Sequence, residues 1–262
     1  MLVAGTLPGV HVRARLKAVG VHFVLSLLVA LATAACVFGL WFPYPFREIA
    51  GGRELFTLVV AVDVVCGPLL TGVAFNIAKP RKELARDLAV IAVIQLAALA
   101  YGVHVVAQAR PVFVAFEVDR FRVVTPAEVD PLKMSTAPAA FAHFGWTGPR
   151  LIAVRVPAPQ DADYLQSLDL SLQGLQAAVR PDHWRPYDSQ RADVRAKAKP
   201  IAALKGAHPE ASQAISKAVA DTGLDESRLG YLPVESRRSM SWVALVDLTN
   251  ADLVGYAPVD GF

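Results

Sequence analysis

Three long apolar runs near the amino terminus constrain this chain more than any other feature. Their only charged residue is Asp63. The runs cover about residues 19–41, 55–77 and 88–107. The hydrocarbon core of a bilayer is about 30 Å thick, and one helical crossing needs roughly 20 apolar residues. The sequence therefore predicts a cytoplasmic tail over residues 1–18 and a three-helix transmembrane domain over residues 19–109, with the lipid bilayer as its surroundings.

The first run is predicted to stay in the mature protein. It is longer than the apolar core of a typical signal peptide. Aromatic residues and prolines follow it (Trp41, Phe42, Pro43, Tyr44), where a cleaved signal would carry small residues.

Basic residues flank the runs unevenly and so predict the orientation. Arg13, Arg15 and Lys17 precede the first run without an acidic neighbour. The segment between the second and third runs is also rich in lysine and arginine, whereas basic and acidic residues balance between the first and second. Positive charge favours the cytoplasmic side. We therefore expect a bacterial inner-membrane protein with a cytoplasmic amino terminus and a periplasmic domain over residues 110–262.

The predicted helices carry surfaces suited to close packing. Ser26, Ala30 and Ala34 recur every fourth residue in the first helix, and such small residues let a second backbone approach closely. This stripe could pack within the protein or contact a partner helix.

In the second helix, Asp63, Cys66, Gly67 and Pro68 form a second candidate packing or partner-contact segment. Pro68 cannot donate a backbone hydrogen bond, which predicts a kink near Gly67. The two cysteines, Cys36 and Cys66, both lie in apolar runs and are expected to be small thiols that pack in lipid, with a bridge as the alternative.

Asp63 is the most unusual residue of this half, because a carboxylate within a membrane span is costly and needs a partner or a purpose. It could bond internally to a residue such as Thr33, or meet a polar group on the transmembrane segment of a partner. A lone carboxylate disfavours a proton or ion pathway.

The remaining residues have ordinary globular composition and predict an α+β domain, with strands at both ends and helices between. A strand or hairpin is expected over 111–124 and a second strand over 151–156. A helix with leucines at helical spacing is expected from Leu165 to Val179, capped by Asp161 or Asp163. Another is expected over 209–222, with Asp225 capping a further turn, followed by a hairpin at the carboxyl end.

No motif for catalysis, a cofactor or a metal occurs in this domain. Glu117 and Asp119 are two residues apart on one strand, but Arg120 and Arg122 beside them favour a solvated, charge-balanced strand face. Residues 110–262 carry 17 basic and 18 acidic residues, so no basic surface for nucleic acid is expected.

Several motifs in order resemble the TfpX/TfpZ family of type IV pilin accessory proteins. They cover about residues 15–124, nearly half of the chain. The motifs are RLKA before the first helix, FPYPFREIAGG after it, DVVCGPLL in the second helix, KPRKEL in the next loop and ARPVFVAFEVDRF after the third helix. The carboxyl-terminal VDLTNADLVGYAPVDGF is similar to the family's ending.

The resemblance implies an inner-membrane, chaperone-like protein that helps its cognate major pilin to be stable or assembled, without enzyme activity or a cofactor. The expected partner is that pilin, through its transmembrane helix and its periplasmic head. A membrane-anchored envelope sensor or regulator with a ligand-binding periplasmic domain is the alternative, although no cytoplasmic output domain is visible. A thiol oxidoreductase using Cys36 and Cys66 ranks third.

Overall fold

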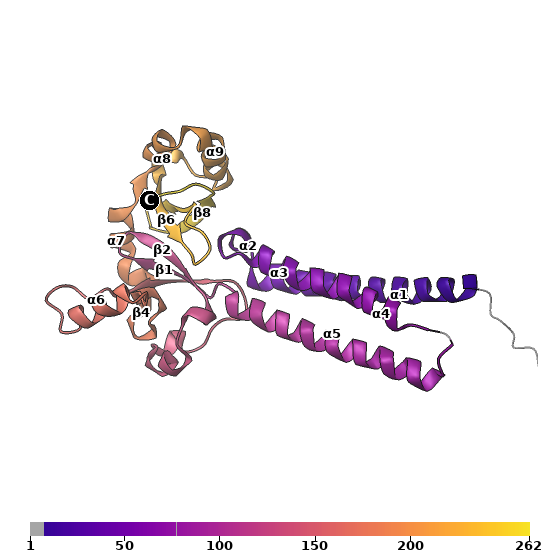
Figure 1. Ribbon diagram of the computed structural model, residues 1–262. Helices are drawn as coiled ribbons and strands as arrows, with labels where there is room; N and C mark the ends of the chain where they lie inside the picture. Colours follow the sequence, from indigo (N-terminus) through magenta and orange to yellow (C-terminus); the bar gives the residue numbers. More distant parts are fainter. Residues whose placement is uncertain (1–7, 77) are drawn as a thin grey trace, which may run out of the picture. The chain divides into compact units, whose positions relative to one another are not determined.

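A computed structural model, which describes residues 8–76 and 78–262, contains three apolar helical segments followed by a mixed α+β domain (Figure 1). Each segment is long and apolar enough to span a membrane. The segments are Val12–Trp41, Gly52–Ala74 and Arg81–Ala109. This arrangement confirms the predicted fold class. The tail residues 1–7 and the expected end of the second span at Ile77 lie outside the described residues.

The first two membrane segments are not uniform α-helices. The first is α1 (Pro8–Cys36) followed by a π-helical turn, η1 (Val37–Trp41); the second is α3 (Gly52–Ala61), the π-helical turn η2 (Val62–Cys66) and α4 (Gly67–Ala74). The third is the single helix α5 (Arg81–Ala109). The expected break in regular hydrogen bonding at Gly67-Pro68 is therefore present as the π-helical turn that ends directly before them.

The chain divides into two compact units. One comprises the helices up to Leu40 together with Gly52–Ala107, and the other joins Trp41–Gly51 to Gln108–Phe262. The expected boundaries put the loop between the first two spans in the transmembrane domain, whereas the structure groups it with the α+β domain.

Two contacts explain why this loop belongs to the α+β domain. It contains α2 (Phe46–Ile49), and the ring of Phe46 packs edge-on against Tyr256, with 5.4 Å between the ring centroids. The Ser236 hydroxyl donates a hydrogen bond of 2.6 Å to the carbonyl of Ile49.

The α+β domain is built on one eight-stranded sheet with the order β4-β3-β1-β2-β6-β7-β8, and β5 pairs with β6 off this path. Its strands are β1 (Phe113–Glu117), β2 (Arg120–Val124), β3 (Arg150–Val154), β4 (Trp184–Pro186), β5 (Lys199–Pro200), β6 (Leu229–Glu235), β7 (Trp242–Asp247) and β8 (Leu253–Ala257). The hairpins β1–β2 and β7–β8 and the strand β3 confirm the predictions. The sequence did not predict β6, which pairs parallel with β2 and antiparallel with β7 and so joins the two hairpins into one sheet.

Four α-helices and eight 3₁₀ turns complete the described part of this domain. The helices are α6 (Tyr164–Leu172), α7 (Arg191–Lys197), α8 (Ile201–Ala207) and α9 (Ser212–Asp221). The turns are η3 (Pro126–Glu128), η4 (Pro131–Thr136), η5 (Ala139–Phe141), η6 (Ala177–Val179), η7 (Pro181–His183), η8 (Tyr187–Gln190), η9 (Pro209–Ala211) and η10 (Glu226–Arg228).

The helix predicted over 209–222 agrees with the structure better than the helix predicted from Leu165 to Val179. The turn η9 and α9 fill the predicted range, and Asp225 caps η10 by accepting the amide of Ser227. In contrast, α6 ends at Leu172 rather than Val179, because Gly174 follows in the left-handed region at φ 87°.

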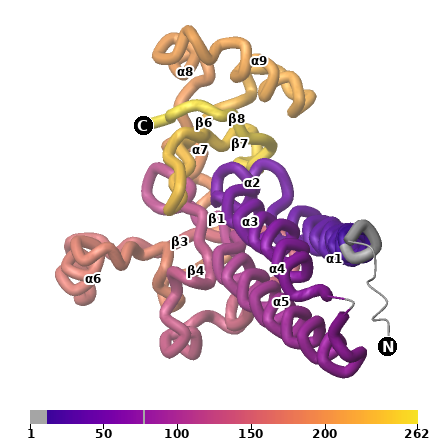
Figure 2. Tube along the Cα trace, turned by 45° about the vertical axis from the view of Figure 1, so that its right-hand side comes forward, coloured from indigo at the N-terminus to yellow at the C-terminus, as the bar shows by residue number. Residues whose placement is uncertain are grey.

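Two apolar clusters form the core of the domain. One surrounds Phe113 and Trp184, both fully buried. The other includes Ile215 of α9 with Val243 and Leu245 of β7. Figure 2 shows α8 and α9 beside the strands β6, β7 and β8.

Candidate functional site: a groove between the apolar helices

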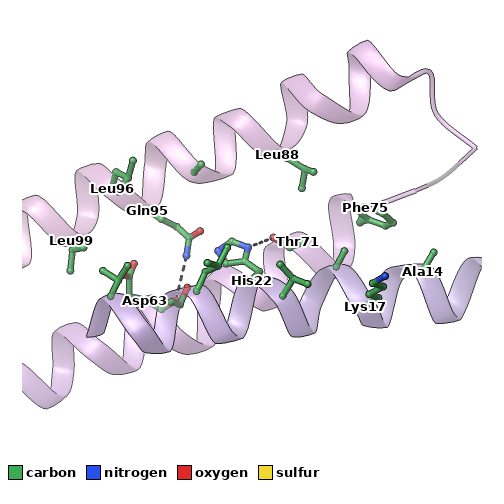
Figure 3. Close-up of a pocket in the computed structure, with 16 residues that line it drawn as sticks. Ala14, Lys17, His22, Asp63, Thr71, Phe75, Leu88, Gln95, Leu96 and Leu99 are labelled. Atoms are coloured by element: carbon green, nitrogen blue, oxygen red, sulfur yellow. Dashed lines mark hydrogen bonds between the residues drawn. The ribbon is translucent and has the colours of Figure 1, made fainter. Parts of the chain in front are cut away.

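A groove with a volume of about 720 Å³ lies between α1, α4 and α5 (Figure 3). Helix α5 diverges from α1 and α4 toward its own amino-terminal end, which keeps the groove open (Figures 1 and 3). Most lining side chains are apolar. The polar ones are Lys17, His22, Ser26, Asp63, Thr71 and Gln95.

Gln95 of α5 holds the broken part of the second span. In a π-helical turn each amide bonds to the carbonyl five residues before it, and the residue five after Asp63 is Pro68, which has no N–H. The Gln95 side-chain amide donates to the Asp63 carbonyl at 3.3 Å, as Figure 3 shows. The third helix thus supplies the donor that the proline removes.

Glycines allow α5 to come this close. A Cβ built on Gly67 would collide with the Gln95 side-chain amide, and one on Gly102 would lie 2.8 Å from a methyl group of Val59. Beyond Gln95 toward Leu88, the divergence of α5 opens the groove (Figure 3).

A second polar contact joins α1 to α4 at the floor of the groove. The Nδ1 atom of His22 and the hydroxyl of Thr71 share a hydrogen bond of 2.5 Å, and Thr71 is buried. His22, Thr71 and Gln95 could have been recognised in the sequence as polar side chains within membrane spans. Each such side chain needs a hydrogen-bond partner in the bilayer.

The side chain of Asp63 lines the groove. Asp63 is the middle residue of Gly52–Ala74, and among the described residues none donates a hydrogen bond to its carboxylate. The hydroxyl of Thr33, the internal partner considered from the sequence, donates instead to the Val29 carbonyl at 2.8 Å.

The small residues of α1 lie mainly inside the bundle. Ser26 and Ala30 are buried, and Ala34 is half-buried. Cys36 and Cys66 are both free thiols on the surface of the apolar helices, so no bridge joins them.

In the α+β domain, the four charged residues expected on a solvated strand face are arranged differently. Arg122 is buried, with ion pairs to Glu128 at 3.3 Å and Glu235 at 2.9 Å, and it also bonds to Gln176. The solvated face is therefore wrong for Arg122. Glu235 and Gln176 come from distant segments, so spacing along the chain could not reveal these two partners.

The other three charges lie around the β1–β2 turn. Glu117 ends β1 and accepts the amide of Ala178 at 3.2 Å. Val118 adopts φ 61°, so Asp119 lies in the turn rather than on the same strand face as Glu117. Arg120 bonds to Asp119 at 2.9 Å and to Glu235 at 3.5 Å. Together with Arg122, Glu128 and Glu235, these groups form a structural network of two arginines and four carboxylates.

The comparisons with known proteins give the family. Residues 10–51 match a family model described as fimbrial assembly protein FimB. Two fimbrial assembly proteins of Dichelobacter nodosus, from serogroups E1 and I, are each 34% identical over 247 residues, which cover 94% of this chain and 95% of each relative. The chain belongs to the FimB family of fimbrial assembly proteins. A third such protein, from serogroups C1 and C2, is 42% identical over 113 residues, or 43% of this chain and 86% of that protein. No solved structure matches significantly.

The FimB model covers two features described above. Residues 10–51 contain the small-residue stripe of α1 and the loop that packs into the α+β domain. The groove and the network around Arg122 fall within the longer alignments to the relatives of serogroups E1 and I.

Glu117 provides a pH-dependent prediction for this FimB-family protein. Burial raises the pKa of the Glu117 carboxyl, so the folded state favours the protonated form. The associated stability is complete below the usual glutamate range and is lost as the pH rises through the raised pKa. Glu117→Gln keeps an acceptor for Ala178 but does not titrate. We expect it to raise the unfolding midpoint of the full chain in detergent at about pH 8 and leave it unchanged at about pH 4.

Asp119→Asn is the control for this prediction, because the Asp119 side chain is 51% exposed. It should leave the midpoint unchanged at both pH values. An equal effect of Glu117→Gln at both pH values would contradict a raised pKa.

Proposed function

We propose that this fimbrial assembly protein is an inner-membrane accessory protein that supports the stability or assembly of a cognate type IV major pilin. Its amino terminus is cytoplasmic and its α+β domain periplasmic, in agreement with the basic residues that flank the spans. The single observation that carries the proposal is the full-length similarity to fimbrial assembly proteins. The groove between the apolar helices suggests how such a protein acts.

A type IV pilin is held in the inner membrane by one long apolar helix, with a folded head outside. A protein that supports it needs a surface for that helix within the bilayer. The groove offers one, since its wall is mostly apolar and its divergent side admits side chains of another helix.

Asp63 gives the groove a polar point near the middle of the bilayer. A carboxylate without a donor is costly in a span, and a polar group on an incoming helix would relieve this cost. Gln95 and the His22–Thr71 pair are engaged within the protein, whereas the Asp63 carboxylate accepts no hydrogen bond from the described residues, so we assign Asp63 as the group that receives the partner.

The test is deletion of the gene in its native host, with complementation by this gene and by one from a different pilin locus. We expect loss of major pilin or of surface pili, restored by the native gene alone. Unchanged pilin and pili would contradict the proposal and favour an envelope sensor. Restoration by both genes would contradict a cognate relationship.

A further inference from the structure

The strand β8 ends the sheet and exposes one edge. It pairs with β7 on one side, and among the described strands none pairs with its other side. The Leu248 amide donates to the Arg228 carbonyl, and the Asp247 amide to the Asp252 carbonyl. Hydrogen-bonded pairs alternate along an antiparallel ladder. The odd-numbered residues of β7 therefore bond to β8 through Gly255 and Ala257, and the backbone of Tyr256, opposite Ala244, faces outward.

A groove with a volume of about 430 Å³ runs along this edge. On one side its wall is α9, which contributes the small side chains of Ala214 and Ala218. On the other side are Tyr44 and Pro45, from the loop that packs against Tyr256 through Phe46. The outward backbone of β8 thus lies between two walls, both within the α+β unit.

The free edge is short. A register shift opposite Leu245 and Val246 disturbs the ladder at one end, and Pro258 follows β8 at the other. Bulges and prolines of this kind limit indiscriminate pairing between sheet edges. At the rim, Lys217 and Asp221 form an ion pair of 2.7 Å, so the rim adds little net charge. This edge therefore offers outward-facing backbone groups beside small apolar side chains.

We infer that an extended segment of the pilin's head adds to the edge of β8 as a further strand, in the groove between α9 and the Tyr44–Pro45 segment. Strand addition uses the partner's backbone for affinity and the groove wall for selection of side chains. Small wall residues at Ala214 and Ala218 leave room for the side chains of that segment. This inference rests on the proposed function, because it assigns the pilin's head to a defined surface.

Ala214→Trp tests this site by filling the groove, and Ala220→Trp is the matched control on α9, since Ala220 is exposed and does not line the groove. The full chain is solubilised in detergent and isolated by an affinity tag, and co-isolated major pilin is measured by immunoblot. We expect Ala214→Trp to reduce the pilin about tenfold at an unchanged level of this protein, as loss of a central contact does. Ala220→Trp should match the unaltered chain, and undiminished pilin with Ala214→Trp would overturn the inference.

A photo-crosslinking amino acid at Lys217, whose side chain is 75% exposed, keeps the inference testable if Ala214→Trp does not accumulate. We expect an adduct with pilin from Lys217 and none from the same amino acid at Ala220. An adduct with a second copy of this chain, or no adduct, would overturn the inference. Deletion of the gene separates the two proposals. If deletion lowers pilin but these variants do not, the strand-addition site alone fails; if deletion has no effect, the proposed function fails.

Discussion

Arg122→Met is expected to destabilise the α+β domain by roughly 3–5 kcal/mol, the usual cost of removing one partner from a buried ion pair. The Arg122 side chain is 11% exposed, and those of Glu128 and Glu235 are 7% and 18% exposed. Without the guanidinium, both carboxylates remain in a poorly solvated site near each other. The effect is measured by urea unfolding of the full chain in detergent, followed by pulse proteolysis.

Arg120→Met is the matched control. Arg120 lies on the same strand as Arg122 and also pairs with Glu235, but its side chain is 34% exposed. Its removal should cost less than about 1 kcal/mol, as for exposed ion pairs. Adding Glu128→Gln to Arg122→Met should recover part of the lost stability, since one uncompensated charge is then absent. Equal effects of Arg120→Met and Arg122→Met would contradict the buried network.

Trp184→Ala is expected to cost about 3–5 kcal/mol, the range for truncating a large aromatic residue in a core. Trp184 is fully buried and packs against Phe113, with 4.8 Å between the ring centroids. Its indole N–H donates to the Ala178 carbonyl at 2.8 Å, so the substitution also leaves a buried carbonyl without its donor. The loss should appear as a lower urea midpoint in the same assay and as less major pilin in cells.

Trp146→Ala is the control for Trp184→Ala, because Trp146 is 74% exposed. It should leave both the midpoint and the pilin level close to those of the unaltered chain. A similar loss of stability from the two substitutions would mean that Trp184 is not the anchor of its cluster.

The parts of the fold that depend on neighbouring residues could be predicted from the sequence. Continuous apolar runs predict the three spans, and alternation with a short turn predicts β1–β2 and β7–β8. Gly67-Pro68 predicts the interruption of the second span, because Pro68 lacks a backbone N–H whatever its surroundings. The predicted end of the helix at Val179 is wrong, because apolar residues at helical spacing continue past Leu172, where the helix ends.

The remaining features depend on residues far apart in the chain. Glu235 is 113 positions from Arg122, and its pairing follows from the parallel register of β2 with β6, a strand that local pattern did not reveal. The attachment of the Phe46 loop to Tyr256 is equally non-local. For the groove, the sequence indicates Asp63 as an unusual residue, but only the packing of three helices brings it into one lining with His22 and Gln95.

The most direct test of the proposed function is photo-crosslinking within the membrane of the native host. Leu96 and Val93 both lie on α5 and are 64% and 66% exposed, but only Leu96 lines the groove beside Asp63. With a photo-crosslinking amino acid at each position in turn, the account predicts an adduct with the major pilin from Leu96 and little from Val93. Equal adducts from both positions, or none from Leu96 in cells that make pilin, would contradict it.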